Sequence, residues 1–339
     1  FTAARVAGTP PEFPFPEVSW YPIVLEVVND RIAILGGHSV LDTDFTYDGL
    51  FYFGAGALTK IWTNSDPEIT VINNRARLTY FGGNALRTPP GAYNGNESLF
   101  WLQWGDIGPS RVTGFYTDLG GLPIRKVISF NDEPPFASPW SYIYSPSMSG
   151  QNLAFAAVET TTGEGVHVFA EIEGTSLTVI QQGDPLPKTS ELFRTALGVE
   201  IANKKVFFIG RGDGTTRGIY KRKPNGVIKR VVDTSQEVPE GPPGTLFTDF
   251  RNLSADRGRI AFEGISALGK AIYVTSGGKL LRVVGEGDTV DGTTVERVFL
   301  HRDGLHGTRI AFGINTVEGT AALFSFLSIH GDADAIYVA

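Results

Sequence analysis

The sequence lacks cysteine altogether and has a single methionine, Met148, among its 339 residues. Disulfide bonds and thiolate metal sites are therefore excluded. It also lacks any uninterrupted apolar run of the roughly 18 residues that a membrane-spanning helix requires, so we expect no membrane span. Gly-rich phosphate loops, nucleophile elbows and H-E-x-x-H patterns are missing too, and no cofactor is predicted.

Runs of basic residues are equally scarce. The formal net charge is −7, and the densest basic cluster, Lys221-Arg222-Lys223 with Lys229-Arg230, is short. A nucleic-acid-binding surface needs clustered Lys and Arg. We therefore expect no nucleic-acid partner and interpret this cluster as the solvated face of a strand.

Glycine, proline and aromatic residues are abundant, with 41 glycines, 20 prolines and 12% aromatics. Short strands joined by tight turns have this composition, and no long stretch has the period of a helix, which favours an all-β fold. A motif with an aliphatic residue before and usually an aromatic residue after one aligned position recurs six times. The copies are Arg31–Ile34, Arg77–Tyr80, Asn152–Phe155, Lys205–Phe208, Arg259–Phe262 and Arg309–Phe312.

Successive copies are 46, 75, 53, 54 and 50 residues apart, and a turn-forming Asn or Gly precedes most of them. Repeats of about 40 to 50 residues made of short strands are typical of propeller blades. The sequence therefore predicts a single six-bladed β-propeller in which each copy is the second strand of its blade and is buried on both faces. The predicted blades are 19–66, 67–134, 135–187, 188–243, 244–291, and 292–339 together with 1–10.

The two ends of the chain are predicted to close the ring. Residues 335–339 resemble the third strands of other blades and residues 1–6 resemble the fourth strands, so we expect these two segments to pair and leave no free edge. Two insertions, 84–96 and 315–334, are expected between the second and third strands of their blades. They lie on the face that also carries the blade-to-blade connections, where a binding site or the mouth of a central channel is expected.

Aspartates recur after the predicted outer strands, at Asp66, Asp132, Asp184 and Asp288. Calcium needs six to eight converging oxygens, and carboxylates supplied one per blade are too far apart to share an ion. We interpret these residues as turn caps. Arg211-Gly212-Asp213 matches an adhesion tripeptide, and a hairpin turn is the favoured interpretation of it.

The motif Gly258-x-x-Ala261-Phe262, the strand Gly218-Ile219-Tyr220 and the Gly-Asp turns resemble those of secreted bacterial tandem-repeat proteins with an N-x-x-G-x-x-A-F repeat. The resemblance covers nearly the whole chain and is clearest over residues 140–300. It implies a β-propeller located outside the cytoplasm and implies no particular reaction. The chain also begins with Phe1 and not with Met, which we take to indicate a processed, exported protein at the cell surface or outside the cell.

One constellation has the chemistry of a catalytic site. Tyr144, Arg251 and His301 each stand ten residues before an aligned position, and Arg302 follows His301. A Tyr or His base beside an Arg that stabilises a carboxylate is what β-elimination from a uronate requires. The alternative, which we favour, is hydrogen bonding within a water-filled channel. His301 and Asp303 are a weaker candidate for a metal site, because only these two side chains share a strand face.

Aromatic side chains are candidates for a surface that binds glycans or other copies of the chain, and two sequons are candidate glycosylation sites. Tyr93, Trp101, Trp104 and Trp140 are candidates for stacking on sugar rings or for contacting a neighbouring subunit, although packing between blades is the favoured interpretation. Asn96 and Asn252 begin N-glycosylation sequons, which matter in a source that glycosylates exported proteins.

Three functions remain open on the sequence alone. The first is an exported, non-enzymatic structural or binding module that self-assembles into a homo-oligomer, filament or matrix. The second is a uronate lyase that uses Tyr144, His301 and Arg251. The third is a lectin-like protein that binds an extracellular glycan.

Overall fold

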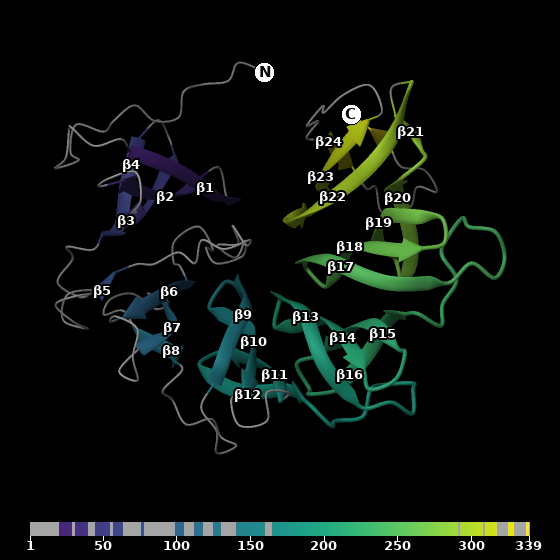
Figure 1. Cartoon of the computed structure of the whole chain (residues 1–339), viewed down its shortest axis with the longest axis horizontal. Coiled ribbons are helices and arrows are strands. Elements are labelled where there is room, and N and C mark those ends of the chain that lie inside the picture. Colours follow the sequence, from purple (N-terminus) through teal and green to yellow (C-terminus); the bar gives the residue numbers. More distant parts are fainter. Residues whose placement is uncertain are drawn as a thin grey trace. The chain divides into compact units, whose positions relative to one another are not determined.

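The computed structural model describes fourteen stretches of the chain, and every regular element in them is a β-strand (Figure 1). These residues contain no helix, and so none that could cross a membrane. The chain divides into two compact units, Phe1–Trp140 and Ser141–Ala339, which we describe separately. The described stretches are 20–28, 31–39, 45–54, 57–63, 76–77, 99–104, 112–117, 125–129, 140–159, 165–290, 292–307, 309–316, 325–328 and 337–338.

The first unit contains two antiparallel four-stranded sheets, each made of strands that are consecutive among those described. One sheet contains β1 (Trp20–Val28), β2 (Arg31–Ser39), β3 (Phe45–Gly54) and β4 (Ala57–Thr63). The other contains β5 (Ala76–Arg77), β6 (Leu99–Trp104), β7 (Val112–Thr117) and β8 (Arg125–Ser129).

The second unit repeats the same antiparallel arrangement, and each sheet again follows chain order. The third sheet contains β9 (Trp140–Ser149), β10 (Asn152–Glu159), β11 (Val166–Ile172) and β12 (Thr175–Gln181). The fourth contains β13 (Phe193–Ala202), β14 (Lys205–Gly212), β15 (Arg217–Arg222) and β16 (Ile228–Asp233). The fifth contains β17 (Phe247–Asp256), β18 (Arg259–Ser266), β19 (Gly269–Ser276) and β20 (Lys279–Gly285). The sixth contains β21 (Thr289–Val290), β22 (Thr293–His306), β23 (Arg309–Thr316), β24 (Ser325–Ser328) and β25 (Tyr337–Val338).

Two-residue turns with left-handed backbone connect the first and second strands of the fourth and fifth sheets. Asn203 and Lys204 have φ angles of 48° and 59°, and Arg257 and Gly258 have φ angles of 48° and 90°. Two successive residues with positive φ are characteristic of the hairpin turn whose twist matches that of the strands. The predicted turn before the repeated motif is thus confirmed in these two sheets.

The second strands of the third, fourth and fifth sheets are buried on both faces, as predicted. In the fourth and fifth sheets, their alternating side chains enter different cores. Phe208 of β14 packs with residues of the third sheet, whereas Phe207 packs with residues of the fifth. In β18, Phe262 faces the fourth sheet and Ala261 faces the sixth. Because side chains alternate across a strand, sheets stacked on both faces require a continuous apolar run.

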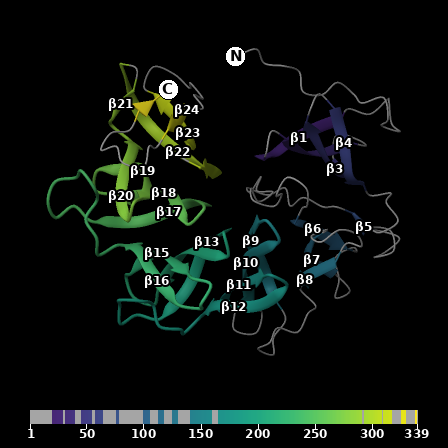
Figure 2. The same cartoon turned by 180° about the vertical axis from the view of Figure 1, so that it is seen from behind.

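The four sheets of the second unit therefore pack against one another through three hydrophobic cores. One lies between the third and fourth sheets, one between the fourth and fifth, and one between the fifth and sixth. The first strands β13 and β17 appear side by side from both directions (Figures 1 and 2), in agreement with the shared core that holds Ala202 and Phe250.

The predicted strand assignment was wrong in the second sheet. Residues 77–80 were expected to begin its second strand, but Arg77 belongs to β5 and pairs with Gln103 of β6, so β6 is the second described strand. The insertion 84–96 consequently lies between β5 and β6 and not between the second and third strands. The local pattern of one aliphatic and one aromatic residue is common to first and second strands, and strand pairing decides between them.

The prediction for the last sheet also needs correction. The segment expected to be an insertion, 315–334, contains β24, which pairs with β23 through Phe312 and Ser325. The C-terminal strand β25 then pairs with β24 and occupies the sheet edge, one position further out than the predicted third strand. Residues 1–6, which were expected to pair with it, lie outside the described residues.

Glycines at one repeated position of the second strands make room for aromatic rings. A Cβ added to Gly264 would lie 2.6 Å from a Phe247 ring carbon and 2.7 Å from a Tyr273 ring carbon, whereas at Gly210 the nearest ring carbons, of Phe208 and Tyr220, are 3.2 Å away. We expect Gly264→Ala to lower the free energy of unfolding by about 1–3 kcal/mol, because two buried rings must shift.

The matched substitution Gly210→Ala is expected to cost less than about 1 kcal/mol, because a small displacement of its neighbours relieves the contact. Urea denaturation of both variants measures the difference. Equal losses would contradict the predicted packing of Tyr273 against Gly264.

Candidate functional site

Connections between consecutive sheets are held by a side-chain cap that recurs in the second unit. Asp184, Gln236 and Asp288 each accept a hydrogen bond from the backbone N–H three residues earlier. The predicted turn caps are thus confirmed at Asp184 and Asp288, while Asp66 and Asp132 lie outside the described residues. The three bonds run from Gln181 N to Asp184 Oδ2 (2.9 Å), from Asp233 N to Gln236 Oε1 (3.1 Å) and from Gly285 N to Asp288 Oδ2 (2.7 Å).

Glu191 fixes the loop between β14 and β15 from the neighbouring sheet connection. Its carboxylate accepts hydrogen bonds from the backbone N–H groups of Gly214, Thr215 and Thr216 at 3.0–3.2 Å. Burial works to raise the pKa of Glu191, but the hydrogen bonds from Thr216, Thr215 and Gly214 together outweigh it, and the net pKa is lowered. The loop edge of the fourth sheet is therefore ordered by a charged acceptor.

This bond pattern predicts a pH-dependent loop. Because the pKa of Glu191 is lowered in the folded state, its stabilising contribution is present above the unfolded value of about 4.3 and is lost as the pH falls through the folded pKa. We expect the amide proton shifts of residues 214–216 to titrate below about pH 4.3 in NMR spectra. In Glu191→Gln this titration should disappear, and its persistence would contradict the assignment.

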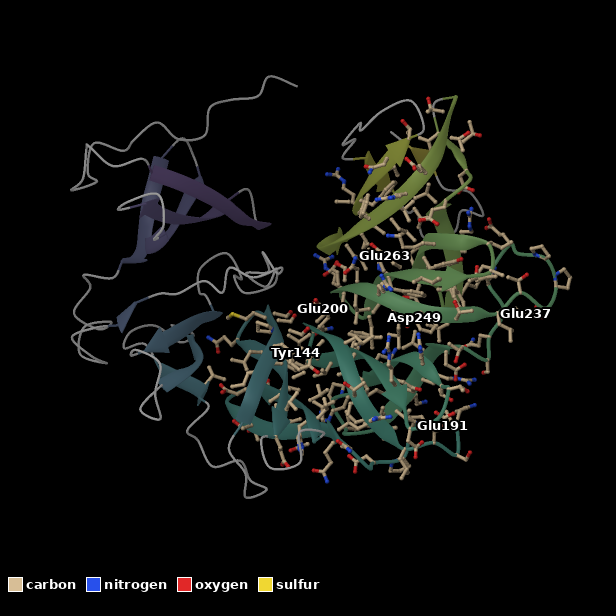
Figure 3. All side chains as sticks on the ribbon, in the orientation of Figure 1. Tyr144, Glu191, Glu200, Glu237, Asp249 and Glu263 are labelled. Atoms are coloured by element: carbon tan, nitrogen blue, oxygen red, sulfur yellow. The ribbon has the colours of Figure 1, made fainter. Side chains whose placement is uncertain are left out.

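At the same loop edge, two arginines share one aspartate. Asp249 of β17 receives Arg217 Nη1 at 3.0 Å and Arg211 Nη2 at 3.4 Å, both on its Oδ2 atom. Arg211 and Arg217 are directly paired residues of β14 and β15, so their side chains leave the same face of the fourth sheet and reach Asp249 on the first strand of the fifth. Asp249 is labelled in Figure 3. We call Arg211 and Arg217 the guanidinium pair.

The guanidinium pair is partly exposed while its aspartate is not. The side chains of Arg211 and Arg217 are 35% and 38% exposed, against 12% for Asp249. Asp249 Oδ1 and Arg211 Nε are buried and make no hydrogen bond to any described residue. Arg211 also belongs to the Arg-Gly-Asp tripeptide, in which Asp213 Oδ1 accepts the Leu192 N–H at 3.0 Å. These bonds support the interpretation of that tripeptide as part of a structural turn.

A β-bulge interrupts the pairing of β1 with β2, of β13 with β14, of β17 with β18 and of β22 with β23. Its most extended form is in β22, where Leu300 and Leu305 pair with Phe312 and Ile310, so that residues 301–304 lie outside the ladder. Bulges of this kind re-aim side chains and occur beside active sites. The other register shifts fall between Val24 and Glu26, Ala196 and Gly198, and Arg251 and Leu253.

Backbone N–H groups on either side of the β22 bulge are held by side chains of the fifth sheet. Each donor lies in or just after β22, and each acceptor lies on β17 or β18, so the bulge is fixed from both ends. The three bonds run from Leu300 N to Glu263 Oε1 (2.8 Å), from Leu305 N to Ser254 Oγ (2.9 Å) and from Gly307 N to Asp256 Oδ2 (2.6 Å).

The predicted trio of Tyr144, Arg251 and His301 is distributed over three strands of three different sheets. Arg251 and His301 lie on β17 and β22, in sheets that share a core. Tyr144 lies on β9, with the fourth sheet between it and Arg251, and its hydroxyl donates to Ala196 O at 2.8 Å (Figure 3). The exposed residue at the same offset on the intervening β13 is Leu197. The side chains of residues 301–303, which include Arg302 and the metal candidate Asp303, lie outside the described part.

The remaining predicted residues fall into two groups. Trp101 and Trp104 lie on β6 and Trp140 begins β9, with side chains that are not described, and Tyr93 and Asn96 lie outside the described residues. Asn252 lies within β17 and donates to Glu263 Oε1 at 2.8 Å, so this sequon is in a strand and not in a loop. No group of three metal-ligating side chains occurs among the described residues.

Sequence reasoning missed Asp249 and the guanidinium pair. A signal was present, because an aspartate between Phe247 and Phe250 is unusual in a strand of this type. Its two partners lie 32 and 38 positions earlier in the sequence, and only the pairing of β14 with β15 brings them together.

No protein-family model matches the chain, and no curated protein sequence matches it. Among solved structures, it is similar to a Mycobacterium tuberculosis puromycin-hydrolyzing peptidase, with a TM-score of 0.42 and 12% identity over 95% of this chain and 53% of the other. It is also similar to polysaccharide lyase Uly1, with a TM-score of 0.43 and 12% identity over 91% of this chain and 76% of the other. A third similar structure is the β-propeller domain of the Trilobed protease from Pyrococcus furiosus. Its TM-score is 0.24, and the identity is 11% over 78% of this chain and 95% of the other. The chain thus spans about half the length of the peptidase.

Proposed function

We propose that the chain is a six-bladed β-propeller closed by residues 1–6 beside β25, and that it acts outside the cell as a non-enzymatic binding module. The stacking of consecutive antiparallel sheets through shared cores supports the propeller. The observation that carries the binding function is the order of the loops. Glu191 fixes the loop between β14 and β15, and the connections between consecutive sheets are held by the caps Asp184, Gln236 and Asp288. Preordered loops bind with a smaller entropic cost.

Binding and assembly are tested together on the full chain. We expect immobilised protein to retain a subset of acidic or neutral polysaccharides without altering them, and electron microscopy of native material to show whether copies assemble into filaments. Turnover of any retained polysaccharide would overturn the non-enzymatic assignment. Absence of binding to every polysaccharide class tested would overturn the binding function.

The uronate lyase is the second candidate, and the fixed bulge of β22 favours it. His301 lies in this bulge, and the bonds from Glu263 and Ser254 hold the flanking backbone in place. A base must be held in position to abstract a proton. The test is the ultraviolet absorbance of unsaturated uronates formed from polyuronates, which should be lost in His301→Ala and Arg251→Ala. If no polyuronate gives this absorbance, the lyase hypothesis is wrong.

A further inference from the structure

We propose that the guanidinium pair binds the carboxylate of a uronate residue in an acidic glycan. This inference rests on the proposed binding function and names the ligand of its loop edge. The carboxylate of Asp249 holds Arg211 and Arg217 together through a single oxygen atom. The ligand carboxylate contacts the guanidinium N–H groups that Asp249 leaves unused.

The donors of the pair exceed the acceptors that the protein supplies. Each guanidinium carries five N–H groups in a planar fork that suits a carboxylate. Arg211 gives one hydrogen bond, to Asp249, and Arg217 has one ion pair to the same oxygen. More than a third of each arginine side chain is exposed. Two cations facing one buried anion leave one positive charge at an accessible position.

The surroundings limit the charge that a ligand can bring. Glu191 and Asp213 are acidic residues of the same loop edge, where their carboxylates accept backbone N–H groups. A polyanion such as nucleic acid would meet these charges, whereas a single carboxylate on an uncharged body would not.

The same acidic residues favour a sugar as that uncharged body. Asp213 is exposed and uses one of its oxygens for Leu192 N, so its other oxygen is an acceptor for a hydroxyl donor. Thr215 and Thr248 add exposed hydroxyl groups at this edge. A uronate combines one carboxylate with several hydroxyl donors, and therefore matches arginines flanked by acidic acceptors.

The test compares a galacturonate trimer with its methyl ester by isothermal titration calorimetry. Methyl esterification removes the charge and keeps the sugar, so we expect at least a tenfold weaker affinity for the ester. Arg217→Gln and Arg211→Gln should each weaken binding of the trimer about tenfold. Arg217→Lys keeps the charge but lacks the planar fork, so we expect its affinity for the trimer to be several-fold weaker.

Arg194→Gln is the matched control, because Arg194 is an exposed arginine of β13 and the substitution removes the same charge. We expect it to change the affinity less than twofold, and thermal unfolding of every variant confirms folding. Equal affinity for acid and ester, or binding that is unaffected in both Gln variants, overturns the guanidinium site. If neutral glycans bind and the galacturonate trimer does not, the binding function stands and the uronate assignment is wrong.

Discussion

Replacing Glu263 with alanine is expected to lower the free energy of unfolding by about 3–5 kcal/mol. Glu263 is 1% exposed and accepts the Leu300 N–H and the Asn252 amide, each at 2.8 Å, with Lys270 Nζ at 3.4 Å. Alanine leaves the buried Leu300 N–H without its acceptor and removes a buried carboxylate from the partly exposed Asn252 amide and Lys270 ammonium. A buried unsatisfied donor costs about 1–3 kcal/mol, and breaking a buried charged network adds to that loss. Urea denaturation measures the total loss.

Two controls separate the network from a general effect of removing charge. Glu263→Gln keeps an acceptor for Leu300, so we expect a loss of only about 1–2 kcal/mol. Glu237→Ala removes an exposed carboxylate of a sheet connection (Figure 3) and should change stability by less than about 1 kcal/mol. In Glu263→Ala the Leu300 amide should also exchange faster with deuterium. Unchanged exchange there would show that Glu263 does not hold the bulge.

The position of Glu263 also explains why the strand pattern of the sequence does not predict a buried glutamate here. The corresponding residue of β14 is Ile209, which is fully buried, so the fold itself accepts an aliphatic side chain at this point. The carboxylate is needed because β22 bulges away from β23 and leaves backbone donors facing the fifth sheet. A sequence pattern identifies a buried strand, but it does not contain the register of the neighbouring sheet.

The second strands are the part of the fold that the sequence predicted best. Ala154, Phe207 and Ala261 lie on β10, β14 and β18, each the second strand of its sheet, because burial on both faces leaves a local apolar signature. The failure at Arg77 has the same origin, since a first strand carries a similar short pattern. Composition within a few residues identifies strands, while their order depends on pairing over long distances.

The candidate site was less predictable for a related reason. The Asp184 and Asp288 caps act on backbone groups three residues away, so turn chemistry revealed them. Arg217 and Asp249 belong to different sheets, and neither has a local feature that indicates the other. Tyr144 and Arg251 share an offset from the repeat and lie on β9 and β17, with the fourth sheet between these strands. That their side chains act together stays a prediction.

Removing the ring of Phe250 is expected to cost about 3–5 kcal/mol, because it leaves a cavity in the core between the fourth and fifth sheets. Phe250 is 0% exposed, and its ring centroid lies 5.2 Å from that of Phe247 and 5.7 Å from that of Phe262. These rings come from two strands of one sheet and pack against residues of the neighbouring sheet, including Phe207. The large loss therefore reflects weaker contact between sheets as well as within one.

Phe299 provides the matched control, because it is also a phenylalanine of a β-strand but is 41% exposed. Its ring receives Lys270 Nζ at 4.8 Å, and a partly exposed cation–π contact contributes about 0.5–1 kcal/mol. We expect Phe299→Ala to cost about 1 kcal/mol by urea denaturation, several-fold less than Phe250→Ala. Similar losses in the two variants would mean that the fourth and fifth sheets do not share the core through which the repeats are stacked.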